Sequence, residues 1–242
     1  MDTTALYWSK ARDGLTTGAS MFPDLTTDDI FRIETRRLWL RWPRASDVVS
    51  ITSFASLPHV ARMTALIPHP YPPGEAERFV MKARADNAGG SALNLAMTQK
   101  GAGRQIIGLV GAHLATASDM EIGYMLTPAV WGKGLATEAV IALADTVFSL
   151  TRADRIIANA RVNNLASRRV LEKTGFVFVD TGLDFLPARG GLHPCDRLQL
   201  NRQAWAAARK ARGEKRPMPP MVQQAHDTTS AKELPSVRQA EG

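Results

Sequence analysis

The chain has 242 residues, of which 45% are hydrophobic and 22% charged, and these values are ordinary for a soluble globular protein. The length suits one domain with appendages or at most two small domains, and no uncharged stretch approaches the roughly 18 residues needed to cross a bilayer. A single cysteine, Cys195, excludes an internal disulfide framework, and no spacing of Cys and His resembles a zinc site. We therefore expect a cytoplasmic protein with no membrane segment and no metal.

The net charge of +7 is compatible with a nucleic acid, an acidic protein or a polyphosphate ligand, or simply with solubility. The sequence has no basic stripe interleaved with aromatic residues and no helix-turn-helix signature. Nucleic acid is therefore disfavoured as a partner.

The two ends of the chain differ in composition from the middle. Residues 1–33 are rich in Thr, Asp and Gly, which predicts a partly mobile N-terminal extension. Residues 209–242 comprise the end of a last helix and a tail of Pro and polar residues, whose composition predicts disorder. Residues 34–208 are expected to form the domain.

In the first half of the domain, strand and helix periodicities alternate. Leu38 and Leu40 alternate with Trp39 and Arg41, as in a strand with one buried face. In chain order, we expect a strand at residues 37–43, a helix at 48–57, a helix opened by 72–75 and closed by 89–90, and strands at 92–98, 105–115 and 120–126.

The second half opens with a strong amphipathic helix, in which Ala136, Val140, Leu143 and Val147 recur at helical spacing. After it, in chain order, we expect a strand at residues 155–160, a helix at 164–173, strands at 176–179 and 197–200, and a basic helix at 204–212. Strands on both sides of a central helix imply a mixed α/β sheet.

The most informative segment is the turn before the amphipathic helix. Gly132 and Gly134 tolerate positive φ angles and allow a ligand to approach the backbone closely. The free amides of the first helical turn form an anion site, to which Lys133 adds a mobile cation, so a pyrophosphate would fit. A dinucleotide fingerprint would need glycine at Thr137, and a P-loop would need Ser or Thr at Gly134. A glycine-rich turn without a ligand stays open as an alternative.

Residues 131–136 read Trp-Gly-Lys-Gly-Leu-Ala, Asn164 and Ser167 form an N-x-x-S pattern, and residues 173–176 read Lys-Thr-Gly-Phe. Together these segments resemble the GCN5-related N-acetyltransferase (GNAT) superfamily, whose pyrophosphate motif, N-x-x-S and K-x-G-F they match. The segments that look like the RimJ/RimL branch, which acetylates ribosomal-protein N-termini, are residues 34–41, 121–124 and 196–205.

The resemblance covers about residues 34–206. It implies an α/β fold with a mixed and largely antiparallel sheet, splayed at the acetyl-CoA site, with helices on both faces. It also implies acetyl-CoA as co-substrate, held by Trp131, Gly132, Lys133, Gly134, Leu135, Ala136 and Thr137.

The chain departs from the family pattern at two positions. Trp131 replaces the usual Arg or Gln, as is common in the RimJ/RimL-like branch. Leu171 stands where several members carry a tyrosine that is thought to protonate the departing thiolate, so that role is vacant or taken by another group.

The remaining roles follow from what acetyl transfer to an amine requires. Glu121 is the candidate base that keeps the amine neutral, and the alternative is a carboxylate in a salt bridge. The resemblance implies an oxyanion donor among the backbone amides near Met125 and Leu126. It implies that Asn164 binds the pantetheine arm, although a helix N-cap is an equal reading. Ser167 would donate a hydrogen bond to the sulfur, or would pack as an ordinary helical serine.

Other conspicuous residues have simpler explanations. His113 lies in an apolar strand and is expected to be a core histidine, and Cys195 is expected to be buried. Residues 57–74 span the connection that walls the acceptor site in the family, or form a rigid loop. The adenosine 3′-phosphate is expected to contact some of Arg152, Arg155, Arg161, Arg168 and Arg169.

We therefore predict an acetyl-CoA-dependent N-acetyltransferase, monomeric or homodimeric, that acts on a protein N-terminus or a small amine by direct attack in a ternary complex. The alternatives are a non-catalytic acyl-CoA-binding module and, from charge alone, a nucleic-acid binder.

Overall fold

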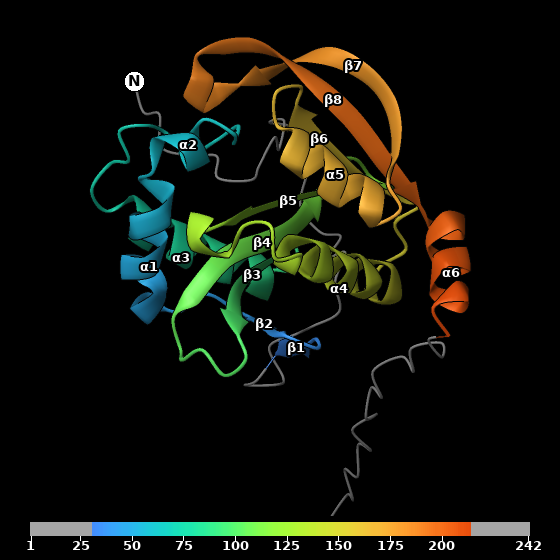
Figure 1. The fold of residues 1–242 in the computed structure, drawn as a ribbon, viewed down its shortest axis with the longest axis horizontal. Helices are drawn as coiled ribbons and strands as arrows, with labels where there is room; N and C mark the ends of the chain where they lie inside the picture. The colour runs from blue at the N-terminus through green and yellow to red at the C-terminus, as the bar shows by residue number, and fades with distance from the viewer. Residues whose placement is uncertain (1–30, 214–242) are drawn as a thin grey trace, which may run out of the picture.

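The computed structural model describes residues 31–213, so the expectations for residues 1–30 and 214–242 lie outside the described residues. One eight-stranded sheet in the order β1-β2-β3-β4-β5-β6-β8-β7 forms the centre (Figure 1). The strands are β1 (Arg32–Glu34), β2 (Leu38–Arg41), β3 (Ala92–Gln99), β4 (Ile106–Leu114), β5 (Asp119–Leu126), β6 (Arg155–Arg161), β7 (Val177–Leu186) and β8 (Gly191–Asn201). The helices are α1 (Val48–Ala55), α2 (Pro58–Ala61), α3 (Glu75–Ala88), α4 (Leu135–Leu150), α5 (Leu165–Lys173) and α6 (Arg202–Ala211).

The sheet opens at its centre. All neighbouring strands pair antiparallel except β5 and β6, which run parallel and pair only from Asp119 to Glu121 against Arg155 to Ile157. Beyond these residues β6 continues to pair with β8 as far as Arg161, while β5 continues along β4. The mixed, largely antiparallel and splayed sheet predicted from the sequence is confirmed.

Helices cover both faces of the sheet, and the strand alternation assigns each side chain to one face. Helices α1, α2 and α3 share a buried cluster with Met125 of β5, and we call this side the α3 face. Helices α4 and α5 share the other cluster with Ile122 and Leu126, and we call this side the α4 face. Because side chains alternate along a strand, Glu121 projects from β5 on the α3 face and Tyr124 on the α4 face.

Two parts of the fold differ from the sequence prediction. The short strands expected at residues 176–179 and 197–200 are the ends of a long hairpin, β7–β8, which arches over α5 and β6 to reach the α2 side of the molecule (Figure 1). Its outer strand exposes Val177, Leu183 and Phe185 and carries turn-forming residues between them, so no buried alternation marked it. Strand β1 and helix α2, of three and four residues, were too short for a periodicity to reveal.

Two features of the described residues bear on membrane insertion and on metal binding. Within residues 31–213 no helix has the length and apolar character to cross a membrane. The same residues contain no group of three or more His, Cys, Asp or Glu side chains that could hold a metal ion.

Candidate active site

A cavity of about 750 Å³ lies where β5 and β6 separate. Its walls come from both faces of the sheet, with the turn before α4 and the start of α5 on one side. The loop after α2 and the tip of the β7–β8 hairpin form the other side. Segments more than a hundred residues apart in the sequence therefore meet around the gap in the sheet.

Hydrogen bonds at the ends of β5 show which of its backbone groups point into the gap. Thr127 N donates to Ile107 O at 2.8 Å, so the backbone N–H and C=O groups of the odd-numbered residues of β5 point toward β4. Asp154 N donates to Ser118 O at 2.8 Å, so the backbone N–H and C=O groups of the even-numbered residues of β5 point toward β6. Both observations agree with the alternation of an antiparallel ladder.

The amides of Tyr124 and Leu126 therefore point into the gap, where β6 no longer pairs with them. Leu126 O is used by the indole of Trp131, whose Nε1 donates to it at 2.9 Å. Of the two amides expected near the reacting carbonyl, that of Leu126 faces the gap and that of Met125 faces β4. Met125 contributes its side chain to the cavity wall instead.

The turn before α4 has the conformation expected for an anion site. Gly132 and Gly134 have φ angles of 74° and 71°, in the left-handed region. A Cβ on Gly132 would meet nothing within 4 Å, so conformation and not crowding calls for glycine there. Helix α4 has no side-chain N-cap, which leaves the amides of Leu135, Ala136 and Thr137 available at the cavity wall.

A brace from the first hairpin holds this turn in place. Arg37 Nε donates to Glu138 Oε2 at 2.6 Å, and Arg37 Nη1 donates to Lys133 O at 2.8 Å. Burial tends to raise the pKa of Glu138, but hydrogen bonds from Thr35 and Arg37 prevail and lower it. The ionised carboxylate is thus neutralised by Arg37 and does not repel an anion at the helix N-terminus. Sequence reasoning missed this brace, because its partners lie far apart in the chain.

Lys133 differs from the expectation of a mobile cation at the ligand. Its Nζ donates to Ala129 O at 3.0 Å, and it does not line the cavity, whereas the other residues of 131–137 do. The helix N-terminus therefore provides the donors of this turn. Trp131, half exposed, lies edge-on to the ring of His59 at 5.6 Å between ring centroids and closes one side of the turn.

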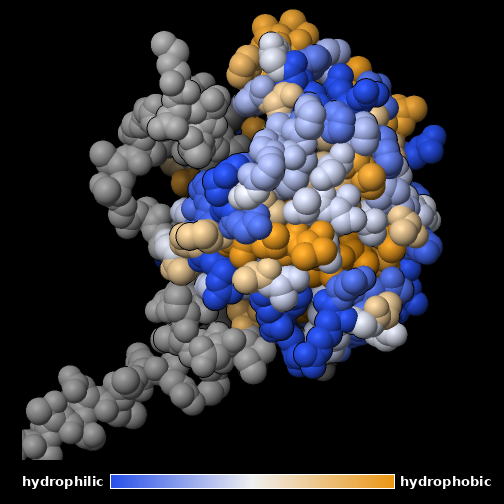
Figure 2. Space-filling view, turned by 90° about the vertical axis from the view of Figure 1, so that its left-hand side faces the viewer, coloured by the Kyte–Doolittle hydropathy of each residue, from blue (hydrophilic) through white to orange (hydrophobic). Residues whose placement is uncertain are grey.

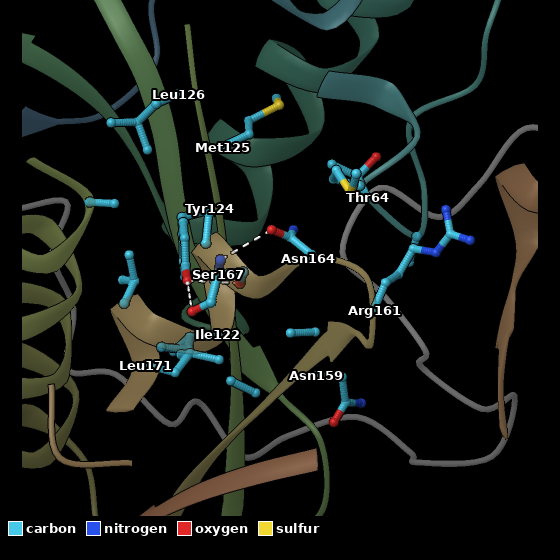
Figure 3. Close-up of a pocket in the computed structure, with 18 of the residues that line it drawn as sticks. Thr64, Ile122, Tyr124, Met125, Leu126, Asn159, Arg161, Asn164, Ser167 and Leu171 are labelled. Atoms are coloured by element: carbon cyan, nitrogen blue, oxygen red, sulfur yellow. Dashed lines mark hydrogen bonds between the residues drawn. The ribbon is translucent and has the colours of Figure 1, made fainter. Parts of the chain in front are cut away.

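At the start of α5, the two candidate residues are tied to each other and to β5 (Figure 3). Asn164 Oδ1 accepts from Ser167 N at 3.1 Å, which is the helix N-cap that the sequence left open. The hydroxyls of Tyr124 and Ser167 lie 2.9 Å apart, and Tyr124 Oη also lies 3.1 Å from Ser167 O. Leu171, one helical turn later, is buried in the same wall.

Tyr124 is the site residue that sequence reasoning did not single out. Burial raises its pKa to about 12, and the hydrogen bond with Ser167 only partly opposes this shift. The phenol therefore stays protonated at neutral pH. Its position within the Glu121–Tyr124 segment was the only sequence signal that could have pointed to it.

On the α3 face, Glu121 and His113 occupy directly opposite positions on β5 and β4. Their side chains are 24% and 13% exposed, both line the cavity, and His113 Nε2 lies 3.6 Å from Glu121 Oε2. The expected core histidine is thus partly buried in a cavity wall, beside the candidate base. A carboxylate and an imidazole on one side of the gap can accept and relay a proton.

The remaining candidates divide into cavity walls and structural ion pairs. The loop after α2 lines the cavity, as expected for residues 57–74, and Cys195 is buried and also contributes to the lining. Arg155 pairs with Asp119, and Arg168 with Glu172 and Asp196. Arg161 and Arg169 line the cavity, and Arg152 does not.

The comparison with known families decides what this site belongs to. Residues 37–177 match the family model described as the acetyltransferase (GNAT) domain. The chain belongs to the GNAT acetyltransferase family. Membership indicates an acetyl-CoA acetyltransferase. The cavity offers the uncapped amides of α4 and, beyond Glu121, strand amides of β5 that do not pair with β6.

Individual relatives of this GNAT protein are distant or match only in part. The probable N-acetyltransferase YjcK of Bacillus subtilis is 49% identical over 55 residues, which cover 23% of this chain but only 30% of that protein. The uncharacterized N-acetyltransferase p20 of Bacillus licheniformis is 27% identical over 152 residues, covering 62% of this chain and 76% of that protein. RimJ of Mycobacterium smegmatis, solved in complex with a CoA-disulfide, aligns with a TM-score of 0.61 at 20% identity, over 76% of this chain and 94% of that one, which shows a shared fold.

Proposed function

We propose that this protein transfers an acetyl group from acetyl-CoA to a primary amine, by direct attack of the amine within a ternary complex. The observation that carries the proposal is the division of the cavity. Uncapped amides of α4 and the hydroxyl pair of Tyr124 and Ser167 lie on the α4 face, whereas Glu121 and His113 lie on the α3 face. The gap between β5 and β6 connects the two sides.

Acetyl-CoA supplies a thioester when it is bound. The amides of Leu135 to Thr137 would hold its pyrophosphate, and Asn164, whose N-cap uses only Oδ1, keeps Nδ2 available for a carbonyl of the pantetheine arm. The amide of Leu126 would donate to the thioester oxygen as negative charge develops on it.

The acceptor amine must lose a proton before or during its attack. Glu121 would accept this proton, directly or through a water. His113, 3.6 Å away, would stabilise the protonated Glu121 or pass the proton onward. A base matters more for lysine, whose pKa is about 10.4, than for an α-amine, whose pKa is about 8.

Departure of the thiolate needs only modest help, because a thiol pKa of about 8.5 already makes it a fair leaving group. Ser167 would donate a hydrogen bond to the sulfur while the hydroxyl of Tyr124 donates to Ser167. The raised pKa of Tyr124 keeps its phenol protonated and able to donate. This pair would take the place of the tyrosine that Leu171 replaces.

The finer assignment is an N-acetyltransferase of the RimJ/RimL type, acting in the cytoplasm on a protein N-terminus or a small amine. The structural similarity to RimJ and the segments at residues 34–41, 121–124 and 196–205 support it. No observation favours the non-catalytic alternative.

The proposal is tested by an acceptor screen with thiol detection. The full chain is incubated with acetyl-CoA and with peptides or small amines, and mass spectrometry follows the acetylated product. We expect amine-dependent thiol release in equal amount to N-acetylated product. Saturable acetyl-CoA binding with no release for any peptide or small amine would favour a non-catalytic acyl-CoA-binding module.

A further inference from the structure

Three arginines gather where the loop after α2 meets the tip of the β7–β8 hairpin: Arg62, Arg161 and Arg189. Arg161 Nη1 donates to Arg62 O at 2.6 Å, and Arg189 donates through Nη2 to Ile67 O. Ala188 N donates to Ala65 O at 3.1 Å, which fastens the hairpin tip to the same loop. In Figure 3, the side chain of Arg161 extends toward the loop that carries Thr64.

The register of the sheet places this cluster on the α3 face, the side of Glu121. Ile157 pairs with Glu121, and Arg161 lies four residues further along the same strand, so both side chains project from β6 on the α3 face. Ala158 and Ala160, between them, are buried in the core under α4. The cluster is thus separated by the sheet from the anion-binding turn of α4.

The charges of the cluster are uncompensated within the described residues. No ion pair among residues 31–213 includes Arg62, Arg161 or Arg189. The acid nearest along the hairpin, Asp184, lines the cavity and forms its ion pair with Arg197, whose Nη2 donates to Oδ1 at 2.8 Å. In the described part of the chain, Oδ2 of Asp184 is buried without a hydrogen-bond partner and forms no ion pair with the three arginines. Burial lowers the pKa of Arg189, and the charges of Arg161 and Arg62 lower it further, which is the mark of repulsion without a counter-ion.

Two donors of the cluster are also unsatisfied. Nε of Arg161 and Nε of Arg189 are buried and have no hydrogen-bond partner in the part of the chain that the structure describes. Buried donors without partners are costly, and a guanidinium with free N–H groups suits a carboxylate or a phosphate. On the side of the molecule seen in Figure 2, a hydrophobic band is bordered by hydrophilic residues.

The strand spacing sets how far the anionic group would lie from the reacting amine. Four residues of β6 separate Arg161 from the position opposite Glu121, which is about 13 Å at the rise of a β-strand. An arginine side chain bridges several ångströms of that distance. An acidic group two to four residues from an acetylated N-terminus would match the separation.

We propose that Arg62, Arg161 and Arg189 form an anion subsite for the acceptor, so that the preferred substrate is a peptide N-terminus with a carboxylate within its first few residues. The inference rests on the proposed function and deepens it by naming the substrate class. The argument depends on the buried, unpartnered Nε atoms of Arg161, which lines the cavity, and of Arg189, which lies beside it at the hairpin tip.

The test compares peptide pairs that are identical except for Asp against Asn at position 2, 3 or 4. With the full chain, we expect kcat/KM to favour the Asp peptide by about 10- to 100-fold at one position, the value of a charge-assisted hydrogen bond or two. In Arg62→Gln and Arg161→Gln, the ratio of kcat/KM for the Asp peptide to kcat/KM for the Asn peptide should fall toward one. Arg161→Lys should retain part of it, and Arg104→Gln, which removes an exposed charge from the β3–β4 connection, should retain all of it.

Two further measurements separate the possible failures. Fluorescence anisotropy of labelled Asp and Asn peptides, with CoA present, reports the preference without turnover, so loss of the proposed activity would not obscure it. Equal binding and equal kcat/KM for the two peptides would overturn the anion subsite while leaving acetyl transfer intact. A loss of affinity for acetyl-CoA in Arg161→Gln, but not for its dephospho form, would instead assign the cluster to the 3′-phosphate and also overturn the proposal.

Discussion

Replacement of Glu121 by glutamine removes the candidate base and keeps the shape of its side chain. A positioned base contributes roughly 10²- to 10⁴-fold to the rate, equivalent to about 3–5 kcal/mol of activation free energy. His113 lies 3.6 Å from the carboxylate and can take over part of the role, so the structure favours the lower end, about 10²-fold in kcat. Acetyl-CoA affinity should barely change, because Glu121 projects from β5 on the α3 face.

The assay follows thiol release from pH 6 to 10 with an α-amine and with a lysine side chain as acceptors. The loss of turnover in Glu121→Gln relative to the wild type should shrink as pH rises, because a growing fraction of each amine is then already neutral. It should shrink first for the α-amine, with a pKa of about 8, and later for lysine. Glu77→Gln, at an exposed position of α3, serves as the matched control and should match the wild type.

A structural carboxylate would behave differently. Glu121→Gln would then lower the melting temperature and affect binding and turnover together, with no dependence on acceptor pKa. Near-wild-type turnover at pH 7 would remove Glu121 from the mechanism.

Three other predictions concern the α4 side of the molecule. Gly134→Val should abolish acetyl-CoA-induced thermal stabilisation, because valine does not tolerate a φ of 71°, and calorimetric binding of acetyl-CoA at wild-type affinity would refute the anion turn. Tyr124→Phe should lower kcat about tenfold with little change in the KM for acetyl-CoA. Because the pKa of Tyr124 is raised from 10 to about 12, the wild type should lose stability between pH 10 and 12 and Tyr124→Phe should lose less, as alkaline unfolding would show. Arg202 donates to three carbonyls at the end of α4 and beyond, including Phe148 O at 2.6 Å, so Arg202→Gln should lower the free energy of unfolding by about 2 kcal/mol in urea titrations and leave kcat unchanged.

The sequence predicted those parts of the fold whose pattern is local. The alternation in β2 and the helical spacing in α4 each report one buried face, and both elements lie where they were expected. The turn at Gly132 and Gly134 was also foreseeable, because only glycine adopts its left-handed conformation readily. The β7–β8 hairpin was underestimated, because an edge strand with exposed Val177, Leu183 and Phe185 has no buried face to mark it.

The parts of the site that escaped prediction depend on contacts between distant segments. The brace of Glu138 by Arg37 joins the first hairpin to α4, and the hydroxyl pair joins Tyr124 of β5 to Ser167 of α5. No local pattern encodes such contacts. The position of His113 beside Glu121 depends on the register of β4 against β5. A one-residue shift of β4 would have placed His113 on the other face of the sheet, away from Glu121.

In the proposed mechanism, acetyl-CoA and the amine approach from opposite faces of the sheet and meet in the gap between β5 and β6. A crystal structure with a bisubstrate analogue, an acceptor peptide joined through its N-terminus to coenzyme A, tests it most directly. We expect the pyrophosphate at the amides of Leu135 to Thr137, the linking carbonyl beside the amide of Leu126, and the peptide on the side of Glu121. A peptide that left the cavity on the α4 face, or a pantetheine arm outside the gap, would contradict it.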